Sequence, residues 1–511
     1  MSDQANHNLY CQFEAAFPED LQATLLQTAD GVRYCYADAR RESARLANYL
    51  TGLGARPGDR VTAQVEKSPQ VLWLYLACLR AGLVYHPLNT AYQASELEYF
   101  LGNAEPRIVV CTGQSETLFN SLAAAGGGTR VLTLEADGSG SLAAGALGCT
   151  DTFDTVVREA DDLAALLYSS GTTGRPKGIM LSHANLASNG RTLVKIWGFT
   201  AADVLLHALP VFHVHGLFIA THCVLLSGAR MRWLDKFDAG VVMAQLPDCS
   251  VMMGVPTYYT RLLAQPGFSR ADCGNMRLFI SGSAPLLAET FAGFEQRTGH
   301  RILERYGMTE TGMNTSNPLH GERRAGTVGP PLPDVEVRVV GGDGMVLPAG
   351  EAGDLQVRGP NVFKGYWRMP QKTRDDFTGD GFFNTGDKAS ISEDGYVSIV
   401  GRSKDMIICG GLNVYPKEIE LVLDDLEGVL ESAVIGVPHA DFGEAVVAVI
   451  VPAGKSQPHE LEIIELSKLR LANFKVPKRV FFLEELPRNA MGKVQKNLLR
   501  ERYADSFSAE A

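Results

Sequence analysis

The sequence has few of the patterns by which cysteine chemistry or protein export is recognised. None of its nine cysteines, which lie between Cys11 and Cys409, belongs to a C-x-x-C pair, and their spacings are irregular. Zinc sites and disulfide-rich extracellular domains both use regular cysteine patterns, so we expect a reduced chain without a structural zinc site. Residues 1–20 carry acidic residues instead of the basic and apolar pattern of a targeting segment. These absences favour a cytoplasmic protein.

Long apolar runs and dense basic runs are also absent. The most apolar stretch, 217–226, is interrupted by His222 and is too short to cross a bilayer, so no membrane partner is expected. Lysine and arginine number 47 against 58 acidic residues, which gives a formal net charge of −11. This balance argues against nucleic acid as a partner. With 511 residues, 45% hydrophobic and 21% charged, the composition is typical of a globular protein with more than one domain.

The most informative segment that is present runs from Tyr168 to Gly178 and reads YSSGTTGRPKG. It lies between two apolar runs, 162–167 and 179–181, so a flexible linker explains it poorly. Glycines let backbone N–H groups approach an anion closely, while the hydroxyls and Lys177 add donors and charge. The Walker A pattern G-x-x-x-x-G-K-[ST] is absent from this segment. The segment therefore predicts a polyphosphate site of another kind.

Six motifs in a fixed order resemble those of the adenylate-forming enzymes, the superfamily of acyl-CoA synthetases, luciferases and peptide-synthetase adenylation domains. They are the glycine-rich segment and then YGMTE (306–310), GYW (365–367), TGD (385–387), GRSKD (401–405) and PRNAMGK (487–493). The resemblance covers nearly the whole chain. It implies an α/β fold in which a large N-terminal domain of layered α/β subdomains, residues 1–401, is joined by a hinge at 402–404 to a small, mobile C-terminal α+β domain, residues 405–511.

The residue pattern by itself also predicts a layered α/β architecture, because helical and strand-like segments alternate. Helices are predicted around 46–53 and over 70–82, 415–423 and 496–503, and strands over 61–65, 108–111, 432–437 and 446–451. Val61, Ala63 and Val65 alternate with polar residues, which predicts a half-buried strand. The segment 123–148 is rich in glycine, alanine and serine, and we predict a loose surface excursion there.

The resemblance implies a reaction in two halves and assigns the ATP site. A carboxylate attacks the α-phosphorus of ATP and expels pyrophosphate, and a thiol then attacks the acyl-adenylate and expels AMP. Glu310 would hold Mg²⁺ against the phosphates, and Thr309 would donate to the α-phosphate. Asp387 would accept from both ribose hydroxyls, with Arg402 beside it. The other residues implied to bind ATP are Ser169, Ser170, Gly171, Thr172, Thr173, Gly174, Lys177, Ser283, Arg305, Tyr306, Gly307 and Met308.

Lys493 resembles the family's lysine that bridges the attacking carboxylate and the α-phosphate. A compact ammonium on a loop suits a group that arrives with a moving domain, and Lys404 occupies the family's hinge position. In the family's second conformation this lysine leaves and the loop 406–412 takes its place, with Gly410 and Gly411 letting the backbone pass the pantetheine arm of coenzyme A. Lys493 is also a candidate target for a lysine acetyltransferase, because acetylation would remove the charge.

The residues expected to line the acyl pocket predict a substrate with a second negative charge. The segment LPVFHVHG (209–216) matches the family motif that lines the acyl channel, and the aspartate that peptide-synthetase domains use for an amino group is missing. The chain offers histidines and cations instead, and a buried distal carboxylate would need a charge-assisted partner. The predicted pocket residues are His207, His215, Lys236, Arg277 and Ser281, with Lys236 and Arg277 facing the distal carboxylate.

Whole segments closely resemble malonyl-CoA synthetases, among them VFHVHGL, MGVPTYYTRLL and GPNVFKGYWRMP. This resemblance implies a malonate:CoA ligase that also accepts methylmalonate, with ATP and coenzyme A as co-substrates and Mg²⁺ as cofactor. Two alternatives stay open. One is a ligase for another short-chain or aryl carboxylic acid, and the other is an adenylation module that loads a carrier protein.

Overall fold

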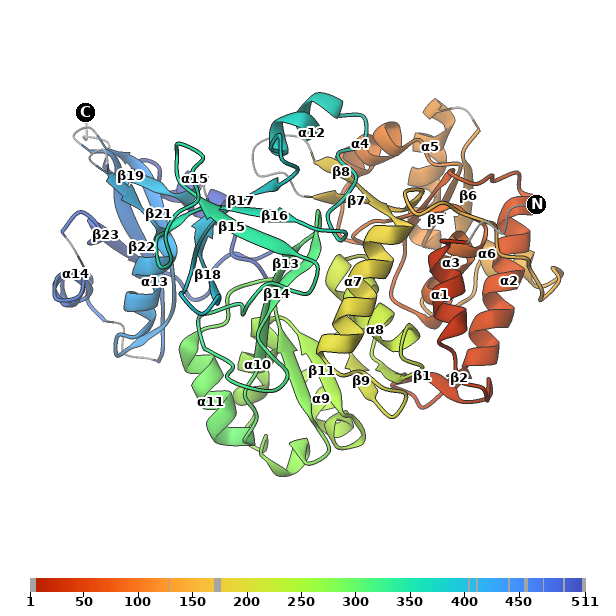
Figure 1. The fold of residues 1–511 in the computed structure, drawn as a ribbon, viewed down its shortest axis with the longest axis horizontal. Helices are drawn as coiled ribbons and strands as arrows, with labels where there is room; N and C mark the ends of the chain where they lie inside the picture. The colour runs from red at the N-terminus through yellow and green to blue at the C-terminus, as the bar shows by residue number, and fades with distance from the viewer. Residues whose placement is uncertain are drawn as a thin grey trace.

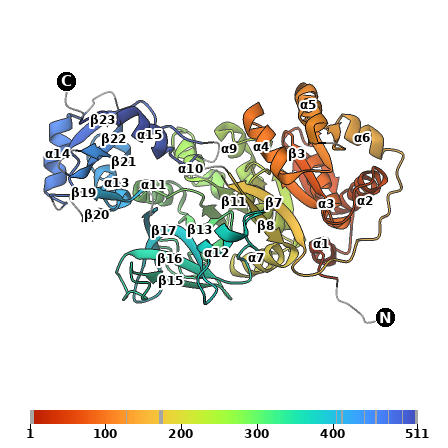
Figure 2. The same ribbon diagram turned by 90° about the horizontal axis from the view of Figure 1, so that it is seen from above.

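The computed structural model describes residues 6–126, 128–169, 176–402, 405–409, 412–439, 442–454, 458–471, 473–489 and 492–507. These residues form four β-sheets with helices packed on them (Figure 1). The blue C-terminal elements lie at one end of the molecule and the red N-terminal helices lie at the other (Figure 2). The predicted fold class, a large α/β part followed by a small C-terminal part, is confirmed. Within the described residues no helix is long and apolar enough to span a membrane.

The first large sheet has the strand order β6-β5-β3-β4-β7-β8 and is parallel except for the pair β7–β8. Its strands are β3 Arg60–Gln64, β4 Val84–Pro87, β5 Ile108–Cys111, β6 Arg130–Thr133, β7 Leu163–Ser169 and β8 Lys177–Ser182. The predicted strand at 108–111 is confirmed as β5. The prediction that the strand at 61–65 is half-buried is wrong, because Val61 to Gln64 are all buried. A central parallel strand is covered by helices on both faces.

The second large sheet has the order β14-β13-β12-β11-β9-β10-β1-β2. Its six central strands are parallel, and only the edge strands β14 and β2 are antiparallel to their neighbours. The strands are β1 Thr24–Thr28, β2 Arg33–Cys35, β9 Val204–His207, β10 Arg230–Trp233, β11 Val251–Gly254, β12 Leu278–Ser281, β13 Leu303–Met308 and β14 Gly312–Ser316. Six parallel strands therefore end at the same edge of this sheet.

Helices cover both large sheets. They are α1 Leu9–Ala15, α2 Tyr36–Gly52, α3 Pro69–Arg80, α4 Ala94–Ala104, α5 Glu116–Gly126, α6 Ser141–Ala146, α7 His183–Ile196, α8 His222–Leu225, α9 Ala239–Gln245, α10 Pro256–Leu263, α11 Ala288–Thr298 and α12 Pro370–Asp376, with a π-helical turn at His215–Thr221. The predicted helix over 70–82 is confirmed as α3. Pro69 starts this helix, where its missing N–H costs nothing, and nearly all of its residues are buried. It belongs to one continuous core with residues of both sheets.

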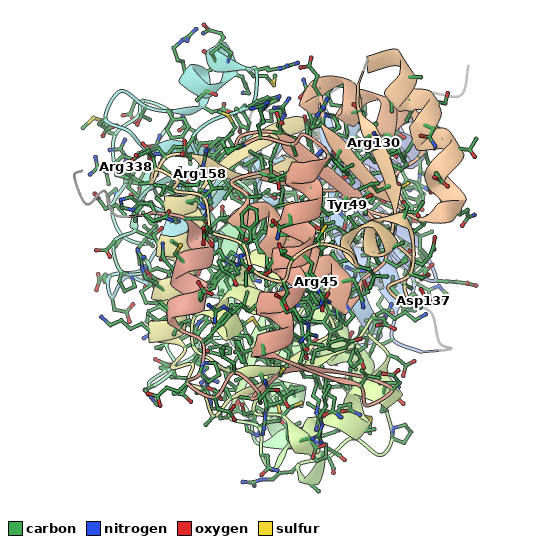
Figure 3. The ribbon with its side chains drawn as sticks, turned by 90° about the vertical axis from the view of Figure 1, so that its right-hand side faces the viewer. Arg45, Tyr49, Arg130, Asp137, Arg158 and Arg338 are labelled. Carbon is green, nitrogen blue, oxygen red and sulfur yellow. The ribbon has the colours of Figure 1, made fainter. Side chains whose placement is uncertain are left out.

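The segment 123–148 is more ordered than its composition predicts. It contains β6 and α6, so the prediction of a loose excursion is wrong. Small residues allow close packing here, since a Cβ at Gly145 would lie 2.1 Å from Cζ of Tyr49 on α2 (Figure 3). Gly145 and the buried Ala123 and Ala146 are therefore packing residues in the structure.

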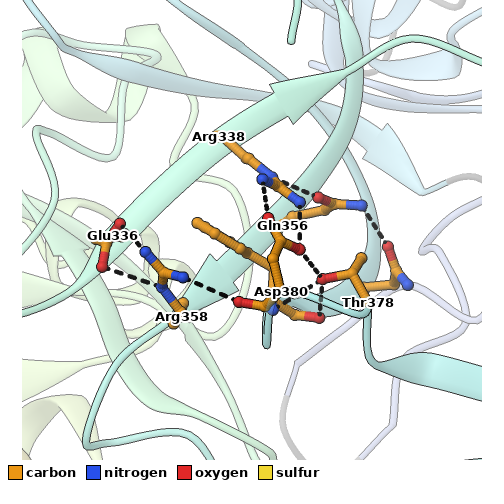
Figure 4. Close-up of polar contacts among 8 residues, drawn as sticks. Glu336, Arg338, Gln356, Arg358, Thr378 and Asp380 are labelled. Carbon is orange, nitrogen blue, oxygen red and sulfur yellow. Dashed lines mark hydrogen bonds and ion pairs between the residues drawn. The ribbon is translucent and has the colours of Figure 1, made fainter. Parts of the chain in front are cut away.

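A four-stranded antiparallel sheet follows the two large ones, in the order β15-β16-β17-β18. Its strands are β15 Glu336–Val340, β16 Gly353–Arg358, β17 Phe383–Ile391 and β18 Val397–Arg402. One face carries an ion-pair cluster in which Arg338 binds Asp380 at 2.6 Å and Arg358 binds Glu336 at 2.6 Å (Figure 4). Both guanidinium groups lie over the Phe382 ring. This face is therefore solvated, while Val339, Leu355 and Ala389 are buried in a small core.

The C-terminal part is a five-stranded sheet with helices. Its elements are β19 Ile407–Cys409, β20 Leu412–Val414, α13 Pro416–Asp424, β21 Val429–His439, β22 Gly443–Pro452, α14 Glu460–Lys468, β23 Arg479–Phe482 and α15 Lys496–Tyr503. The predicted helices at 415–423 and 496–503 are confirmed as α13 and α15, and the predicted strands as β21 and β22. Hydrophobic clusters lie on both faces of the sheet, so this part has a core of its own.

Candidate active site

The carboxyl ends of the parallel strands in the second large sheet bring predicted site residues together. His207 is the last residue of β9, Ser281 is the last residue of β12, and Arg305 lies in β13. In open α/β sheets, ligands bind beyond the carboxyl ends of the strands. Residues that are far apart in the sequence therefore share one edge of the sheet, where a ligand site is expected.

Several buried polar side-chain atoms near this edge have no hydrogen-bond partner among the described residues. They include Oγ of Ser281, Nε2 of His215, and Nε and Nη2 of Arg305. Arg305 is only 3% exposed. Buried polar groups are normally paired, and each unpaired group costs about 1–3 kcal/mol. Open donors on a buried cation are the arrangement that an anionic ligand would complete.

The guanidinium group of Arg305 packs directly against the backbone of Gly282. A Cβ at Gly282 would lie 2.3 Å from Cζ of Arg305. Burial lowers the pKa of Arg305 to about 10, so its guanidinium is charged at neutral pH. Burial and then the charges of Lys493 and Arg305 lower the pKa of His213 to about 3, and burial and then Arg305 lower the pKa of His215 well below its usual value. Both imidazoles are therefore uncharged hydrogen-bonding groups.

Ser283 has backbone angles that are rare for a residue other than glycine. Its φ is 73°, and its Oγ lies 3.3 Å from Nδ1 of His215. Such angles cost of order 1–3 kcal/mol and cluster at functional sites. This predicted ATP-site residue thus contacts a predicted acyl-pocket residue, so the two predicted regions are adjacent.

The predicted phosphate loop falls largely outside the described residues. Ser170, Gly171, Thr172, Thr173 and Gly174 lie there. The structure gives the backbone of Ser169, which ends β7 and pairs with Lys177 at the start of β8. The described residues on the two sides of the loop, Ser169 and Lys177, therefore belong to neighbouring antiparallel strands of the first large sheet.

Lys177 and Glu310, assigned by resemblance to phosphate and metal, both lie near Tyr366. Nζ of Lys177 donates to the Tyr366 hydroxyl at 3.2 Å and lies 3.8 Å from a carboxylate oxygen of Asp376. Burial raises the pKa of Tyr366 well above its usual value, and the charges of Glu310 and Asp376 raise it further. Glu310 is buried. The GYW motif gave no role for Tyr366, and its position is a finding of the structure.

Asp387, the predicted ribose ligand, is buried on β17. The Tyr306 hydroxyl donates to its Oδ2 at 2.5 Å, and Arg402 pairs with it across β17 and β18. The side chain of Arg402 is not described. Strand β13 requires glycine directly after Tyr306, because a Cβ at Gly307 would lie 2.0 Å from the carbonyl oxygen of Gly312.

The end of the YGMTE segment lies beside these groups. Met308 is the last residue of β13, and its Sδ is 3.9 Å from the Tyr306 hydroxyl. Thr309 lines a small cavity together with Asn185 and Asn361. The segment therefore extends from Tyr306, which binds the buried Asp387, to the buried Glu310.

The loop that carries Lys493 lies against the large part of the molecule. A Cβ at Gly492 would lie 3.4 Å from Oγ1 of Thr257 on α10. The loop is closed by the Lys493 N–H, which donates to Oδ1 of Asn489 at 3.0 Å. The Lys493 charge also acts on the buried His213. The structure therefore brings Lys493 to the side of the molecule that carries Arg305. Lys404, Gly410 and Gly411 lie outside the described residues.

Arg277 lies away from the other predicted pocket residues. It precedes β12, so it stands at the amino end of the strand that carries Ser281 at its carboxyl end. Its Nε and Nη2 donate to the two carboxylate oxygens of Asp203 at 2.7 and 2.9 Å, and its Nη1 donates to the Trp197 carbonyl at 3.0 Å. The structure therefore places Arg277 outside the predicted acyl pocket, because its guanidinium group pairs with Asp203 at the amino end of β12.

His207 and Lys236 stay at the carboxyl edge. His207 is fully buried, and its Nε2 lies 2.9 Å from the Gly216 carbonyl. Its Nδ1 lies 2.9 Å from Nζ of Lys67, a residue that the sequence analysis missed because a single lysine between a strand and a helix belongs to no motif. Lys236 is exposed and follows Leu234, whose N–H donates to the His207 carbonyl at 3.1 Å.

Glu304, next to Arg305 on β13, makes stability depend on pH. Its Oε1 accepts from the Leu286 N–H at 3.1 Å, its Oε2 has no partner among the described residues, and burial raises its pKa to about 7. The unfolded chain releases this proton near pH 4.5, so wild-type stability falls from there up to about pH 7. We expect Glu304→Gln to remove this loss. Its advantage over wild type should grow to about 3 kcal/mol by pH 7 and then level off.

Denaturant unfolding of both proteins between pH 5 and 8 measures this advantage. The glutamine keeps an oxygen for the Leu286 N–H, so a general loss of packing is not expected. Unfolding midpoints that stay parallel over this pH range would show that the carboxyl of Glu304 is not held in its neutral form.

Comparison with known proteins follows the same division of the chain. A family model described as "AMP-binding enzyme" matches residues 13–367, and one described as "AMP-binding enzyme C-terminal domain" matches residues 418–493. The ATP-bound structure of MatB from Rhodopseudomonas palustris is 53% identical, covers 99% of this chain and 100% of its own, and has a TM-score of 0.97. The apo structure of the same protein has a TM-score of 0.86. The arrangement of this chain is thus more similar to the ATP-bound form.

Two named relatives differ in the acid they act on. A malonate–CoA ligase of Arabidopsis thaliana is 34% identical over 98% of this chain and 91% of its own length. A feruloyl-CoA synthase of an Amycolatopsis species is 36% identical over 93% of this chain and 94% of its own length. Overall identity therefore does not decide which acid a chain of this kind accepts.

Proposed function

The chain belongs to the AMP-binding enzymes as an AMP-forming acid–CoA ligase, and on this premise we propose that its acid is malonate. Malonate attacks the α-phosphorus of ATP, which gives malonyl-adenylate and pyrophosphate. The coenzyme A thiol then attacks the acyl carbon, gives malonyl-CoA and releases AMP. Methylmalonate, which has one more methyl group, is included as a second substrate.

The position of Lys236 is the observation on which the proposal of a dicarboxylate substrate rests. Lys236 follows β10 at the edge where β9 ends in His207, and Leu234 ties the two strand ends together. A distal carboxylate entering this edge would meet an ammonium group, and a carboxylate paired in this way avoids the cost of burial without a partner. The similarity to a malonate–CoA ligase over almost the whole chain supports this choice.

The residues present fit Mg²⁺ held together with ATP. Mg²⁺ usually keeps several waters and binds one or two carboxylates plus substrate phosphates. Glu310 supplies one buried carboxylate near Lys177, the predicted phosphate ligand. Among the described residues no cluster of three histidines, cysteines or acids could hold a metal without the substrate. Mg²⁺ would offset the charge of the phosphates, and Glu310 would orient it.

The proposed cycle also uses the C-terminal part as a moving cap. Residues 1–401 would form the body, 402–404 the hinge around Lys404, and 405–511 the cap. After adenylation, Lys493 would leave, and the loop with Gly410 and Gly411 would approach the pantetheine arm of coenzyme A. A lysine acetyltransferase acting on Lys493 stays part of the proposal, since loss of the charge would block the first half-reaction.

Exchange of labelled pyrophosphate into ATP tests the acid. We expect the greatest exchange with malonate, less with methylmalonate, and little with acetate or a coumarate-like acid. Lys236→Met should raise the KM for malonate about 10-fold or more while the KM for ATP changes less than about 2-fold, because one charge-assisted contact of about 1.5–3 kcal/mol is lost.

Lys195→Met is the matched control, because Lys195 is exposed on α7. An unchanged KM for malonate in Lys236→Met would remove Lys236 from the pocket. A wild-type preference for the aryl acid would replace malonate with a substrate like that of the feruloyl-CoA synthase relative.

A further inference from the structure

A buried ammonium group lies behind His207. Lys67 is 8% exposed, and its Nζ lies 4.4 Å from the centre of the Trp233 ring. Burial lowers its pKa well below the usual value, and the charge of Asp235 raises it. Asp235 is exposed, and within the described part of the chain Lys67 forms no ion pair. A lysine buried in this way normally has a carboxylate partner.

The hydrogen bonds of Lys67 fix its protonation state. Nζ lies 2.9 Å from Nδ1 of His207, 2.9 Å from the His207 carbonyl oxygen and 2.6 Å from the Leu234 carbonyl oxygen. The two carbonyls only accept. Nε2 of His207 lies 2.9 Å from the Gly216 carbonyl, so Nε2 carries a hydrogen. Burial keeps this imidazole neutral, and Nδ1 must therefore accept. Three acceptors require three N–H donors, which only the charged ammonium has.

This charge lies directly behind the acyl side of the site. The imidazole of His207 is bound on one side by Lys67 and on the other by Gly216, in the segment that lines the predicted acyl channel. His207 in turn acts on the pKa of His215, whose Nε2 has no hydrogen-bond partner in the described ranges. The chain Lys67–His207–Gly216 thus connects an uncompensated positive charge to the pocket wall. All three protons of the ammonium are already used, so it reaches a ligand through its field and not by contact.

We propose that Lys67 is a specificity-determining residue whose uncompensated ammonium gives the acyl pocket the positive potential that favours an acid with a second carboxylate, while its N–H fixes the tautomer of His207. The inference rests on the proposed function, because it names what selects malonate. Interactions between charges separated by low-dielectric protein are screened much less than in water. Lys67 therefore acts as a positioning residue through His207, in addition to the direct contact proposed for Lys236.

The test compares Lys67→Met with wild type on malonate, on malonamate and on propanoate, by pyrophosphate exchange. Malonamate has the shape of malonate but an uncharged amide at its distal end. We expect kcat/KM for malonate to fall about 10- to 100-fold, as for the loss of about 1.4–3 kcal/mol. The values for malonamate and propanoate should change less than about 3-fold, because these acids have no second charge. The readout is the ratio of kcat/KM for malonate to kcat/KM for malonamate, because a merely structural role of Lys67 would leave this ratio unchanged.

Arg80→Met is the matched control. Arg80 is also a buried cation, held by the Arg40 carbonyl at 2.7 Å and the Phe153 carbonyl at 2.6 Å and lying over the Tyr10 ring. Its loss removes a buried charge on α3 without touching His207. The Arg80 variant should lose stability and keep the wild-type substrate ratio. If Lys67→Met does not fold, Lys67→Gln removes the charge and keeps hydrogen-bond donors.

The outcomes are separable. If wild type prefers malonate and the ratio is unchanged in both neutral Lys67 variants, the inference is wrong and the proposed function stands. If all three acids lose activity equally, Lys67 only supports the fold of the pocket and the inference is also wrong. If wild type prefers propanoate, the proposed substrate and this inference fall together. A selective fall with malonate, absent in Arg80→Met, supports the inference.

Discussion

Lys493→Ala is expected to lose about 100- to 1000-fold in pyrophosphate exchange and to retain the second half-reaction. The first half brings a carboxylate to a polyphosphate, so a cation placed where negative charge develops lowers the barrier, and removing one such group typically has this effect. The Lys493 loop lies against α10, and its charge acts on His213. Release of malonyl-CoA from supplied malonyl-adenylate and coenzyme A measures the second half.

Lys496→Ala serves as a control, because Lys496 is on the same segment but is paired with Glu420. That variant should lose stability of the C-terminal part and keep both half-reactions in similar proportion. If Lys493→Ala lost both half-reactions equally, the model in which the cap presents different residues to each half would be contradicted.

Arg305→Met is expected to lower kcat/KM for adenylation at least about 100-fold and to make the ligand-free protein more stable. Two charge-assisted hydrogen bonds to an anion, each of about 1.5–3 kcal/mol, would be lost. Nε and Nη2 are buried and have no hydrogen-bond partner in the part of the chain that the structure describes, so an apolar side chain of similar length removes a cost of about 1–3 kcal/mol. Thermal unfolding with and without ATP should show a higher midpoint for the free variant and a smaller shift on addition of ATP.

Arg323→Met is the control, and the opposite pattern is expected for it. Arg323 donates to the carbonyls of Pro318, Arg301 and Leu319 at 3.2, 2.6 and 2.9 Å. Its loss leaves these carbonyls without that partner, so stability should fall while adenylation is kept. An Arg305 variant that was less stable without ligand and normal in activity would show that Arg305 is structural.

Local sequence patterns predicted the helices and strands whose structure depends only on the residues of their own segment. Helix α3 begins at a proline and is apolar on all sides, and β5 is a short apolar run, so composition and length define both. The half-buried assignment of β3 failed because periodicity reports the side chains of one strand and not the helices that cover its second face. The segment 123–148 was misjudged for a similar reason, since Gly145 is small in order to pack on Tyr49.

Site residues that belong to sequence motifs could be predicted. Residues whose role depends on contacts with residues far away in the sequence could not. Arg277 was predicted in the pocket as a cation near pocket-forming motifs, but β12 separates it from Ser281, so the two residues lie at opposite ends of that strand. Lys67 was missed because its proposed role depends on its hydrogen bonds to His207 and Leu234, which are distant in the sequence. A lone lysine is usually a surface charge, and only its burial and its three acceptors distinguish it.

The order of the site residues along the chain has a consequence during synthesis. The sheet edge with His207, Ser281 and Arg305 is encoded well before the loop that carries Lys493. A nascent polypeptide in which Lys493 has not yet been added therefore carries this edge without the ammonium group proposed to start the chemistry. If Lys493 acts as proposed, such an unfinished chain forms no reactive acyl phosphate anhydride.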